Sequence, residues 1–404
     1  MIPVEEAIGR IIRGFKPLAP EQVSLASAHG RVLAEDAISR RTQPPVAVSA
    51  MDGYAVIASD VATIPVILDV VAYVAAGDTF DGTLKPGQAS RIFTGAPVPN
   101  GANTIVIQEN TEASGDCVTV KESVDEGRYI RPKGMDFSAG DVGLKSGQLL
   151  SARDIGFAAA MNLPWLMVRR RPKIAILATG NEIVMPGAEI GAGKIVSSNS
   201  LALGATIRAL GGEPLQLGIA PDDRETLRCM VAGAKGADLL LTTGGVSVGE
   251  HDLVRSVLGE EGMELDFWQI AMRPGKPLMF GKIGETPVIG LPGNPVSTMV
   301  CSIIFLKPAM QAMLGMMGSN KRRSTATLGS DLGANDERQD YLRAQLSHDD
   351  SGNAIATPFS RQDSSMIANL AQADCLVVRS PGAPELKAGH KVEIILIGDG
   401  LLQI

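Results

Sequence analysis

Between residues 173 and 321, uniformly apolar runs alternate along the chain with stretches that carry helix signals. The apolar runs are KIAILATG (173–180), PLQLGIAP (214–221), ADLLLTTGG (237–245) and PVIGLPG (287–293). The stretches between them favour helices over 200–212, 224–234, 251–260 and from residue 294 to about 315. Strands that are apolar on both faces and alternate with helices are typical of a parallel sheet covered on both sides. The pattern predicts a central doubly wound parallel-sheet α/β domain over 173–321.

The helix starts in this region carry capping residues. Asn199 is expected to cap the helix over 200–212, which the Gly211-Gly212 pair would end. Asp222 and Asp223 stand before the next helix, where one of them is expected to be the cap.

Outside this region the pattern changes twice. Apolar residues at helical spacing from Val4 to Phe15 predict an amphipathic helix. Residues 43–142 are β-rich and punctuated by turns, and residues 322–404 predict a small β domain with a hairpin across 350–353. The predicted domains are 1–42 plus 143–172 (helical or mixed, a linker), 43–142 (β), 173–321 (α/β) and 322–404 (β).

Composition and charge fit a multidomain protein of this kind. The chain has 404 residues, 45% hydrophobic and 20% charged, which is too long for a single core. A net charge of −7 argues against a general nucleic-acid binder, and the basic run 169–173 is interpreted as a linker because no aromatic residues interleave with it. The four cysteines form no CxxC pair and HExxH is absent, so we expect neither a zinc site nor a disulfide framework. Without a signal peptide or an 18-residue apolar span, we expect no membrane contact and a cytoplasmic location.

Three loops follow strands of the predicted sheet: 179–182, 243–252 and 291–297. In an open α/β sheet, ligands lie beyond the carboxyl ends of the strands. The loops are poor in bulky side chains and rich in backbone N–H groups, and two of them lead into helix N-termini, which favour anions. Glycine after a strand is also ordinary turn chemistry, but three such loops at one sheet edge favour a phosphate-bearing ligand.

Acidic residues accompany these loops. Glu182, Asp252 and one of Asp222 and Asp223 come from neighbouring strands. Two carboxylates about 4 Å apart repel by about 4 kcal/mol at an effective dielectric constant of about 20, and a bound phosphate would add to the repulsion. A Mg²⁺ ion with oxygen ligands would remove the conflict. Simple helix capping remains the alternative for whichever of Asp222 and Asp223 does not face the ligand.

Other features are less specific. Met272–Pro277 (MRPGKP) places two cations around a tight turn, either as a surface hairpin or as a grip for an oxyanion. Asp52 in SAMDGYAV and Thr94 in RIFTGAPVP would, taken alone, be turn residues. No GxGxxG follows a strand, and GAEIGAGKI lacks the residues of a P-loop, so neither a Rossmann dehydrogenase nor a P-loop NTPase fits.

Taken together, SAMDGYAV, TGAPVP, RPKGMDFSAG, LATGNEI, TTGGVSVGEHD, RPGKP, GLPGNPVS and SRQDSSM occur in the order typical of one family. The chain resembles a molybdopterin molybdenumtransferase of the MoeA/gephyrin E-domain family along essentially its whole length. The resemblance implies a transferase that takes adenylylated molybdopterin and molybdate, releases AMP and leaves molybdenum on the dithiolene sulfurs. It also implies an elongated homodimer of four-domain subunits with an inter-subunit active site, dimerised through the linker domain. Further partners would be the upstream adenylyltransferase and acceptor molybdoenzymes.

The resemblance assigns roles to individual residues. Mg²⁺ would be bound by Glu182 and Asp252, which join Asp52, Thr94 and Asp136 as the catalytic set. The nucleotide pocket would be formed by residues of the three loops and of the 222–223 pair: Thr179, Gly180, Asp222, Asp223, Gly244, Gly245, Ser247, Pro292, Gly293, Asn294 and Pro295. Molybdate would be held by Arg273, Lys276 and Ser364, with Ser365 as the alternative to Ser364. Some members of the family have lysine at the position of Arg273, which leaves the geometry of that contact open.

Two other functions are compatible with parts of the sequence. A molybdopterin adenylyltransferase shares the α/β domain but would consume ATP, and it lacks the MDGYAV and TGAPVP segments. A gephyrin-like binding scaffold would call for an additional oligomerisation domain, which does not fit within these residues.

Overall fold

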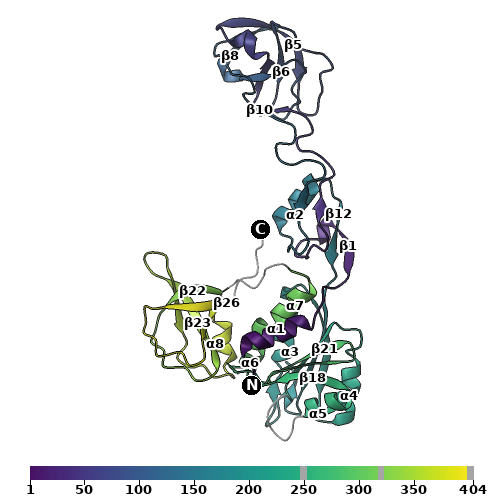
Figure 1. The fold of residues 1–404 in the computed structure, drawn as a ribbon, viewed down its shortest axis with the longest axis vertical. Helices are drawn as coiled ribbons and strands as arrows, with labels where there is room; N and C mark the ends of the chain where they lie inside the picture. Colours follow the sequence, from purple (N-terminus) through teal and green to yellow (C-terminus); the bar gives the residue numbers. More distant parts are fainter. Residues whose placement is uncertain (246–252, 317–322, 398–404) are drawn as a thin grey trace.

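The computed structural model describes residues 1–245, 253–316 and 323–397. The molecule is elongated (Figure 1). A β-rich part lies at one end, a small mixed part lies in the middle, and the α/β domain and the C-terminal β domain lie side by side at the other end. This architecture confirms the predicted fold class.

The α/β domain is built on a six-stranded sheet of order β16-β13-β17-β21-β20-β18. Its parallel strands are β16 (Glu213–Ala220), β13 (Lys173–Thr179), β17 (Leu239–Thr243) and β21 (Thr286–Leu291). The edge strands β20 (Met279–Ile283) and β18 (Met263–Trp268) are antiparallel, which the prediction of a parallel sheet did not include. Only residues 284–285 connect β20 to β21, and a connection this short can form a hairpin but not a crossover.

Helices cover both faces of this sheet. Alternate residues of β13 and β17 enter opposite cores: Ile174 and Leu239 face one, and Ala175 and Leu240 face the other. The helices are α3 (Asn199–Ala209), α4 (Arg224–Ala232), α5 (Leu253–Glu260), α6 (Pro295–Cys301) and α7 (Lys307–Met313), with a π-helix, η4 (Ser302–Leu306), between α6 and α7. The continuous helical run Pro295–Met313 is long and apolar enough to span a membrane by length and composition alone. Two thirds of it (67%) is buried inside the protein, as expected of a core helix.

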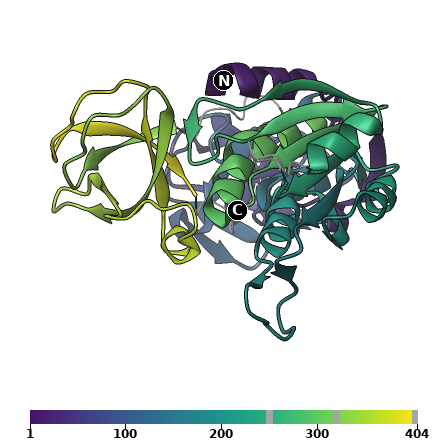
Figure 2. The same ribbon diagram turned by 90° about the horizontal axis from the view of Figure 1, so that it is seen from below.

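The first helix, α1 (Val4–Arg13), was predicted to belong to the domain formed by residues 1–42 and 143–172. In the structure it packs against the α/β domain instead. Val4, Ala7 and Ile11 lie in the core that contains Ile174, and α1 contacts α7 and the π-helix. Their spacing places all three side chains on one face of the helix, which the α/β core buries completely or nearly so. The β14–β15 segment, with β14 (Ile183–Val184) and β15 (Ile195–Val196), projects from the same domain (Figure 2).

The middle part joins residues from both sides of the distal β domain. Strand β1 (Pro20–Ser24) pairs with β12 (Trp165–Arg169), and β2 (Ala37–Ile38) pairs with β11 (Val142–Leu144). Helix α2 (Ala152–Ala160) begins at a capping box formed by Ser151 and Asp154.

The two β domains have different topologies. The distal sheet has the order β7-β4-β6-β5-β9-β8, with strands β7 (Thr104–Ile107), β4 (Gly53–Val56), β6 (Gln88–Ile92), β5 (Val66–Val74), β9 (Cys117–Val120) and β8 (Thr111–Ser114). A further pair, β3 (Val48–Ser49) and β10 (Ile130–Arg131), lies at its base. The C-terminal strands are β22 (Arg323–Leu328), β23 (Gln339–His348), β24 (Ala354–Pro358), β25 (Cys375–Arg379) and β26 (Lys391–Leu396), with the short helix α8 (Ile367–Ala371). Pairing of β23 with both β24 and β25 closes them into a small barrel, and the β23–β24 connection is the predicted hairpin.

Candidate active site

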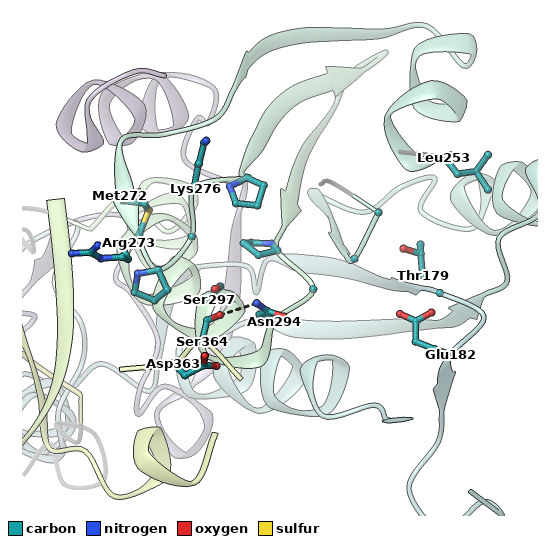
Figure 3. Close-up of a pocket in the computed structure, with 18 of the residues that line it drawn as sticks. Thr179, Glu182, Leu253, Met272, Arg273, Lys276, Asn294, Ser297, Asp363 and Ser364 are labelled. Atoms are coloured by element: carbon teal, nitrogen blue, oxygen red, sulfur yellow. Dashed lines mark hydrogen bonds between the residues drawn. The ribbon is translucent and has the colours of Figure 1, made fainter. Parts of the chain in front are cut away.

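A cavity of about 1000 Å³ opens where the carboxyl ends of β13, β17 and β21 meet the C-terminal domain (Figure 3). Loop residues that follow these strands, the turn Met272–Pro277 and residues 338 and 362–364 line it. In Figure 3, Asn294 and Ser364 lie between an end formed by Thr179 and Glu182 and an end formed by Arg273 and Lys276. The structure thus brings the three predicted loops together at one site.

The first loop supplies a hydroxyl and a carboxylate. Gly180 has a φ of 137°, and a Cβ at this position would lie 2.6 Å from a carboxylate oxygen of Glu182. The glycine therefore leaves the space that the Glu182 side chain occupies. Thr179 is 6% exposed, and its Oγ1 has no hydrogen-bond partner among the described residues. A buried hydroxyl without a partner that lines a cavity is suited to bind a ligand.

The aspartates 222 and 223 have different positions. Asp222 lines the cavity, and it exchanges two hydrogen bonds with Asn181: the backbone N–H of Asn181 donates to Asp222 Oδ2 (3.2 Å), and that of Asp222 donates to Asn181 Oδ1 (3.0 Å). Asp223 caps α4 by accepting from the Thr226 backbone N–H at 2.8 Å. Hydrogen bonds from the side chain and backbone of Thr226 hold the pKa of Asp223 below its ordinary value. Of the two acids, Asp222 faces the site.

The second loop brings bare backbone to the cavity. Gly244 and Gly245 have φ values of 92° and 63°. A Cβ on Gly244 would lie 2.7 Å from the carbonyl oxygen of Thr179, and one on Gly245 would collide with Val254. Both positions therefore require glycine, for backbone conformation and for space. The predicted site residues Ser247 and Asp252 lie outside the described residues.

The third loop links the α/β domain to the C-terminal domain. The side-chain amide of Asn294, the residue before α6, donates to Ser364 Oγ at 2.7 Å, and Val296 N–H donates to the Ser364 carbonyl at 3.1 Å. Pro292 and Gly293 line the cavity, and Pro295 is the first residue of α6.

The structure also distinguishes Ser364 from Ser365, the two candidates for the predicted molybdate contact. Ser364 lines the cavity, whereas the Ser365 hydroxyl donates to Asp363 at 2.6 Å. Hydrogen bonds from the Ser365 side chain and backbone lower the pKa of Asp363.

Asn199 does not make the side-chain cap that its sequence position predicted. The N-cap of α3 is Ser198, which makes no side-chain cap bond, and Asn199 is the first residue of the helix. Its amide instead donates to Thr243 Oγ1 (2.9 Å) and to the Gly293 carbonyl (2.7 Å), which joins the second loop to the third. The capping prediction was wrong because the helix begins one residue earlier than expected, which makes Asn199 its first residue, and Asn199 Oδ1, the atom that would accept a cap bond, has no hydrogen-bond partner among the described residues.

The cationic end of the cavity is made by the turn 272–277. Lys276 is exposed and lines the cavity, and no hydrogen bond or ion pair joins its side-chain ammonium to another described residue. Arg273 also lines the cavity, but its guanidinium contacts Asp336, Asp340 and Asn335 of the C-terminal domain. Pro274 and Gly275 between these two cations are buried, so the turn packs against the core.

Several lining residues were not predicted individually: Arg224, Ser256, Arg338, Gln362 and Asp363. Gln362 and Asp363 belong to the SRQDSSM motif, so the sequence carried a signal for them. Arg224 directly follows the cap of α4, where the expectation of a capped helix masked any role in a site. Arg338 has no local motif, and only the docking of the C-terminal domain brings it to the cavity.

Three predicted catalytic residues lie far from this cavity within one chain. Asp52 and Thr94 belong to the distal β domain, and Asp136 lies between β10 and β11, in the segment that leads from the distal domain to the middle part. The Thr94 backbone N–H and hydroxyl both donate to Asp52 Oδ1 at 2.8 Å. These bonds, the backbone one first, hold the pKa of Asp52 below its ordinary value, so the carboxylate is ionised at neutral pH.

Comparison with known proteins identifies the class first. Residues 175–312 match the model of a "probable molybdopterin binding domain", which is the α/β domain that carries the glycine loops. Residues 2–162 match the MoeA N-terminal region (domains I and II), and residues 325–397 match the MoeA C-terminal region (domain IV). The chain belongs to the MoeA family, as its motifs indicated.

Relatives match it along nearly their whole length. Molybdopterin molybdenumtransferase 2 of Mycobacterium tuberculosis is 32% identical over 96% of this chain and 97% of its own. The molybdopterin molybdenumtransferase of Nostoc sp. is 35% identical over 93% of this chain and 88% of its own. The crystal structure of the molybdopterin biosynthesis MoeA protein of Pyrococcus horikosii superposes with a TM-score of 0.85 at 31% identity, over 98% and 99% of the two chains.

Proposed function

We propose that this protein is a molybdopterin molybdenumtransferase of molybdenum cofactor biosynthesis. It takes adenylylated molybdopterin and molybdate, and water adds across the phosphoanhydride bond to give AMP and the phosphate monoester of molybdopterin. Molybdate loses an oxygen as water, which takes the two thiol protons, as the two dithiolene sulfurs bind molybdenum. The observation that carries the proposal is one cavity that holds bare glycine backbone at one end and, at the other, a lysine whose ammonium has no partner among the described residues, in a chain whose full-length relatives carry this name.

The two ends of the cavity suit two different anions. At the first end, the glycine backbone of the second loop and the Thr179 hydroxyl would contact the phosphates of the adenylylated substrate. At the other end, Lys276 and Ser364 would hold molybdate, because an unpaired ammonium and a hydroxyl bind a tetrahedral oxyanion by charge and hydrogen bonding. Phosphoanhydride cleavage needs positioning and charge neutralisation more than a protein nucleophile, and this set of residues supplies both.

The acids fit a Mg²⁺ ion that comes with the phosphates. Glu182 and Asp222 both line the cavity, and Thr179 adds a hydroxyl that has no partner among the residues described. The described residues contain no group of three acidic, histidine or cysteine side chains placed to hold a metal alone. That partial oxygen set suits Mg²⁺, which keeps several waters and binds through one or two carboxylates plus substrate phosphates. When bound, the ion would neutralise charge on the phosphoanhydride, with Asp252 as a further ligand.

In this proposal, Asp52 of the distal β domain takes part in the reaction only if two subunits form a dimer. Among the described residues that line the cavity, none comes from residues 43–142. We therefore assign Asp52, Thr94 and Asp136 to the cavity of the partner subunit in a cytoplasmic homodimer. The ionised Asp52, held by Thr94, would act there as a fixed negative charge or base.

The experiment uses purified protein, adenylylated molybdopterin, molybdate and Mg²⁺, with AMP measured by chromatography. We expect AMP release that requires molybdate and Mg²⁺, and no consumption of ATP when free molybdopterin is offered. Consumption of ATP with molybdopterin would assign the chain to the adenylyltransferase reaction instead.

A further inference from the structure

Arg273 lines the oxyanion end of the cavity, yet its charge is already neutralised by the C-terminal domain. Its Nη1 lies 3.1 Å from Asp336 Oδ2, and its Nη2 contacts both Asn335 Oδ1, at 3.2 Å, and Asp340 Oδ2. Neither Asp336 nor Asp340 lines the cavity. Two carboxylates outside the cavity therefore bind the guanidinium, and they weaken its attraction for an anion in the cavity.

The two acids differ in burial. Asp340 is 4% exposed, and its second oxygen, Oδ1, is buried without a hydrogen-bond partner among the described residues. A carboxylate this buried depends on its cation, because removal of one partner leaves a buried uncompensated charge. Asp336 is exposed and also accepts from Arg338 Nη2 at 2.6 Å. The Arg338 side chain, ahead of its backbone and of Arg273, lowers the pKa of Asp336 to about 2.

These contacts stand at one junction between the two domains. Strand β19 (Met272–Arg273) pairs with the start of β23, with Arg273 opposite Asp340. At another junction, Ser364 bonds to Asn294 and to the backbone of Val296. Within the C-terminal domain the buried Arg343 of β23 joins the two, because its Nη2 donates to the Asp363 carbonyl at 3.1 Å. The position of β23 therefore sets the position of Ser364 in the cavity wall.

We infer that Arg273, Asp336 and Asp340 form a latch that positions the C-terminal wall of the cavity, and that Lys276 rather than Arg273 is the cation that binds the oxyanion. The inference rests on the proposed function, because it concerns the molybdate end of the same cavity. It makes Asp336 and Asp340 positioning residues for the reaction, acting through Ser364. Arg273 suits this role because its planar fork can bind several oxygens at once, which a lysine cannot.

If Arg273 is a latch, one substitution should change the molybdate affinity in one direction. If Arg273 is a direct ligand of the oxyanion, the same substitution should change it in the opposite direction. If Arg273 were the oxyanion ligand, Asp340→Asn would release its charge toward the cavity and tighten molybdate binding. If Arg273 is a latch, the same substitution loosens the wall that carries Ser364 and weakens molybdate binding. AMP binding, at the far end of the cavity, should stay unchanged, which a general loss of stability would not allow.

The test is isothermal titration of molybdate, and separately of AMP with Mg²⁺, into the full-length protein and its variants. We expect Asp340→Asn and Arg273→Ala each to weaken molybdate binding by about tenfold or more, and the double variant to be no weaker than either single one. AMP affinity should stay within about twofold of the unsubstituted protein. Glu337→Gln is the matched control, because Glu337 is an exposed acid of the same segment and is not among the described ion-pair partners of Arg273, so its substitution should change neither titration.

Tighter or unchanged molybdate binding by Asp340→Asn would overturn the latch. If Asp340→Asn does not fold, the exposed Asp336→Asn takes its place with the same expected sign. If the unsubstituted protein binds no molybdate, the proposed function fails at its oxyanion step, and the latch is judged separately by thermal unfolding of Arg273→Ala, Asp340→Asn and the double variant. Additive shifts in that cycle would show that the two residues are uncoupled and would also overturn it.

Discussion

At the scale of single residues, the phosphate end of the cavity depends on the absence of side chains. Gly244 combines a φ of 92° with an approach to the Thr179 carbonyl that leaves no room for a Cβ. Thr179 in turn has a buried hydroxyl beside this backbone, and this hydroxyl has no hydrogen-bond partner in the part of the chain that the structure describes. The surface that we assign to the phosphates is thus main chain plus one hydroxyl, and its shape is fixed by two glycines.

The substitution Gly244→Ala tests this directly. The methyl group would meet the Thr179 carbonyl at 2.7 Å, so the loop must move, and we expect AMP release to fall by about a hundredfold. Gly236→Ala is the control: its φ of 86° imposes the same backbone strain, of about 1–2 kcal/mol, but its Cβ would meet nothing within 4 Å. The control should lower the unfolding midpoint and retain activity. Equal loss of activity in both variants would contradict a steric role for Gly244.

Residue types could be predicted from the sequence more reliably than their partners. Glycines after apolar runs predicted the phosphate loops, since few other residues tolerate those conformations. The amide of Asn199 was assigned to a cap because its nearest sequence neighbours begin a helix, whereas its acceptors, Thr243 and Gly293, are distant in sequence. The partners of Arg273 were hidden for the same reason: they lie more than sixty residues further along the chain.

At the scale of elements, the two adjacent acids before α4 have different roles: one lines the cavity and the other caps the helix. Asp222 ties the end of β16 to the loop after β13 through Asn181, and Asp223 caps the helix. Because successive side chains at a strand–helix junction point in different directions, one acid can serve each purpose. The sequence showed that one of them would be a cap, but the choice depended on backbone geometry.

Paired substitutions should separate the two roles. Asp222→Ala should weaken AMP binding, because the Asn181 backbone N–H in the 179–182 loop loses its acceptor, Asp222 Oδ2, while amide exchange at the start of α4 stays slow. Asp223→Ala should accelerate exchange of the Thr226 amide, which loses its acceptor, while AMP affinity is retained. Titration calorimetry and hydrogen exchange on the same samples provide the comparison. Loss of AMP binding only in Asp223→Ala would reverse the assignment.

Element types followed from periodicity where apolar runs were long, and the prediction failed where the runs were short or mixed with polar residues. The parallel strands β13, β17 and β21 are apolar on both faces and were predicted from that property. The antiparallel edge formed by β18 and β20 carries mixed residues and was not distinguished from loops and turns. Helix α1 was recognised as a helix, but the face against which it packs is supplied by residues more than 160 positions away.

At the scale of the whole molecule, the chain separates acids that its family resemblance places in one reaction. Glu182 lies in the cavity, and Asp52 lies at the opposite end of an elongated subunit. A two-fold symmetric dimer would form two equivalent sites, each with the cavity of one chain and the distal domain of the other. Such a dimer would make each subunit inactive alone and each site sensitive to both chains.

Co-expression of two differently tagged inactive chains tests the shared site. Asp52→Ala and Glu182→Ala should each abolish AMP release, but a mixed dimer would contain one site in which both residues are intact. Random pairing makes half of the dimers mixed, so about a quarter of the normal activity should return. Glu182→Ala mixed with Gly244→Ala is the control, because both changes affect the cavity itself and every site in the mixed dimer stays defective. If the purified mixed dimer of the first pair is inactive, the two acids do not meet across subunits, and Asp52 must act outside this cavity.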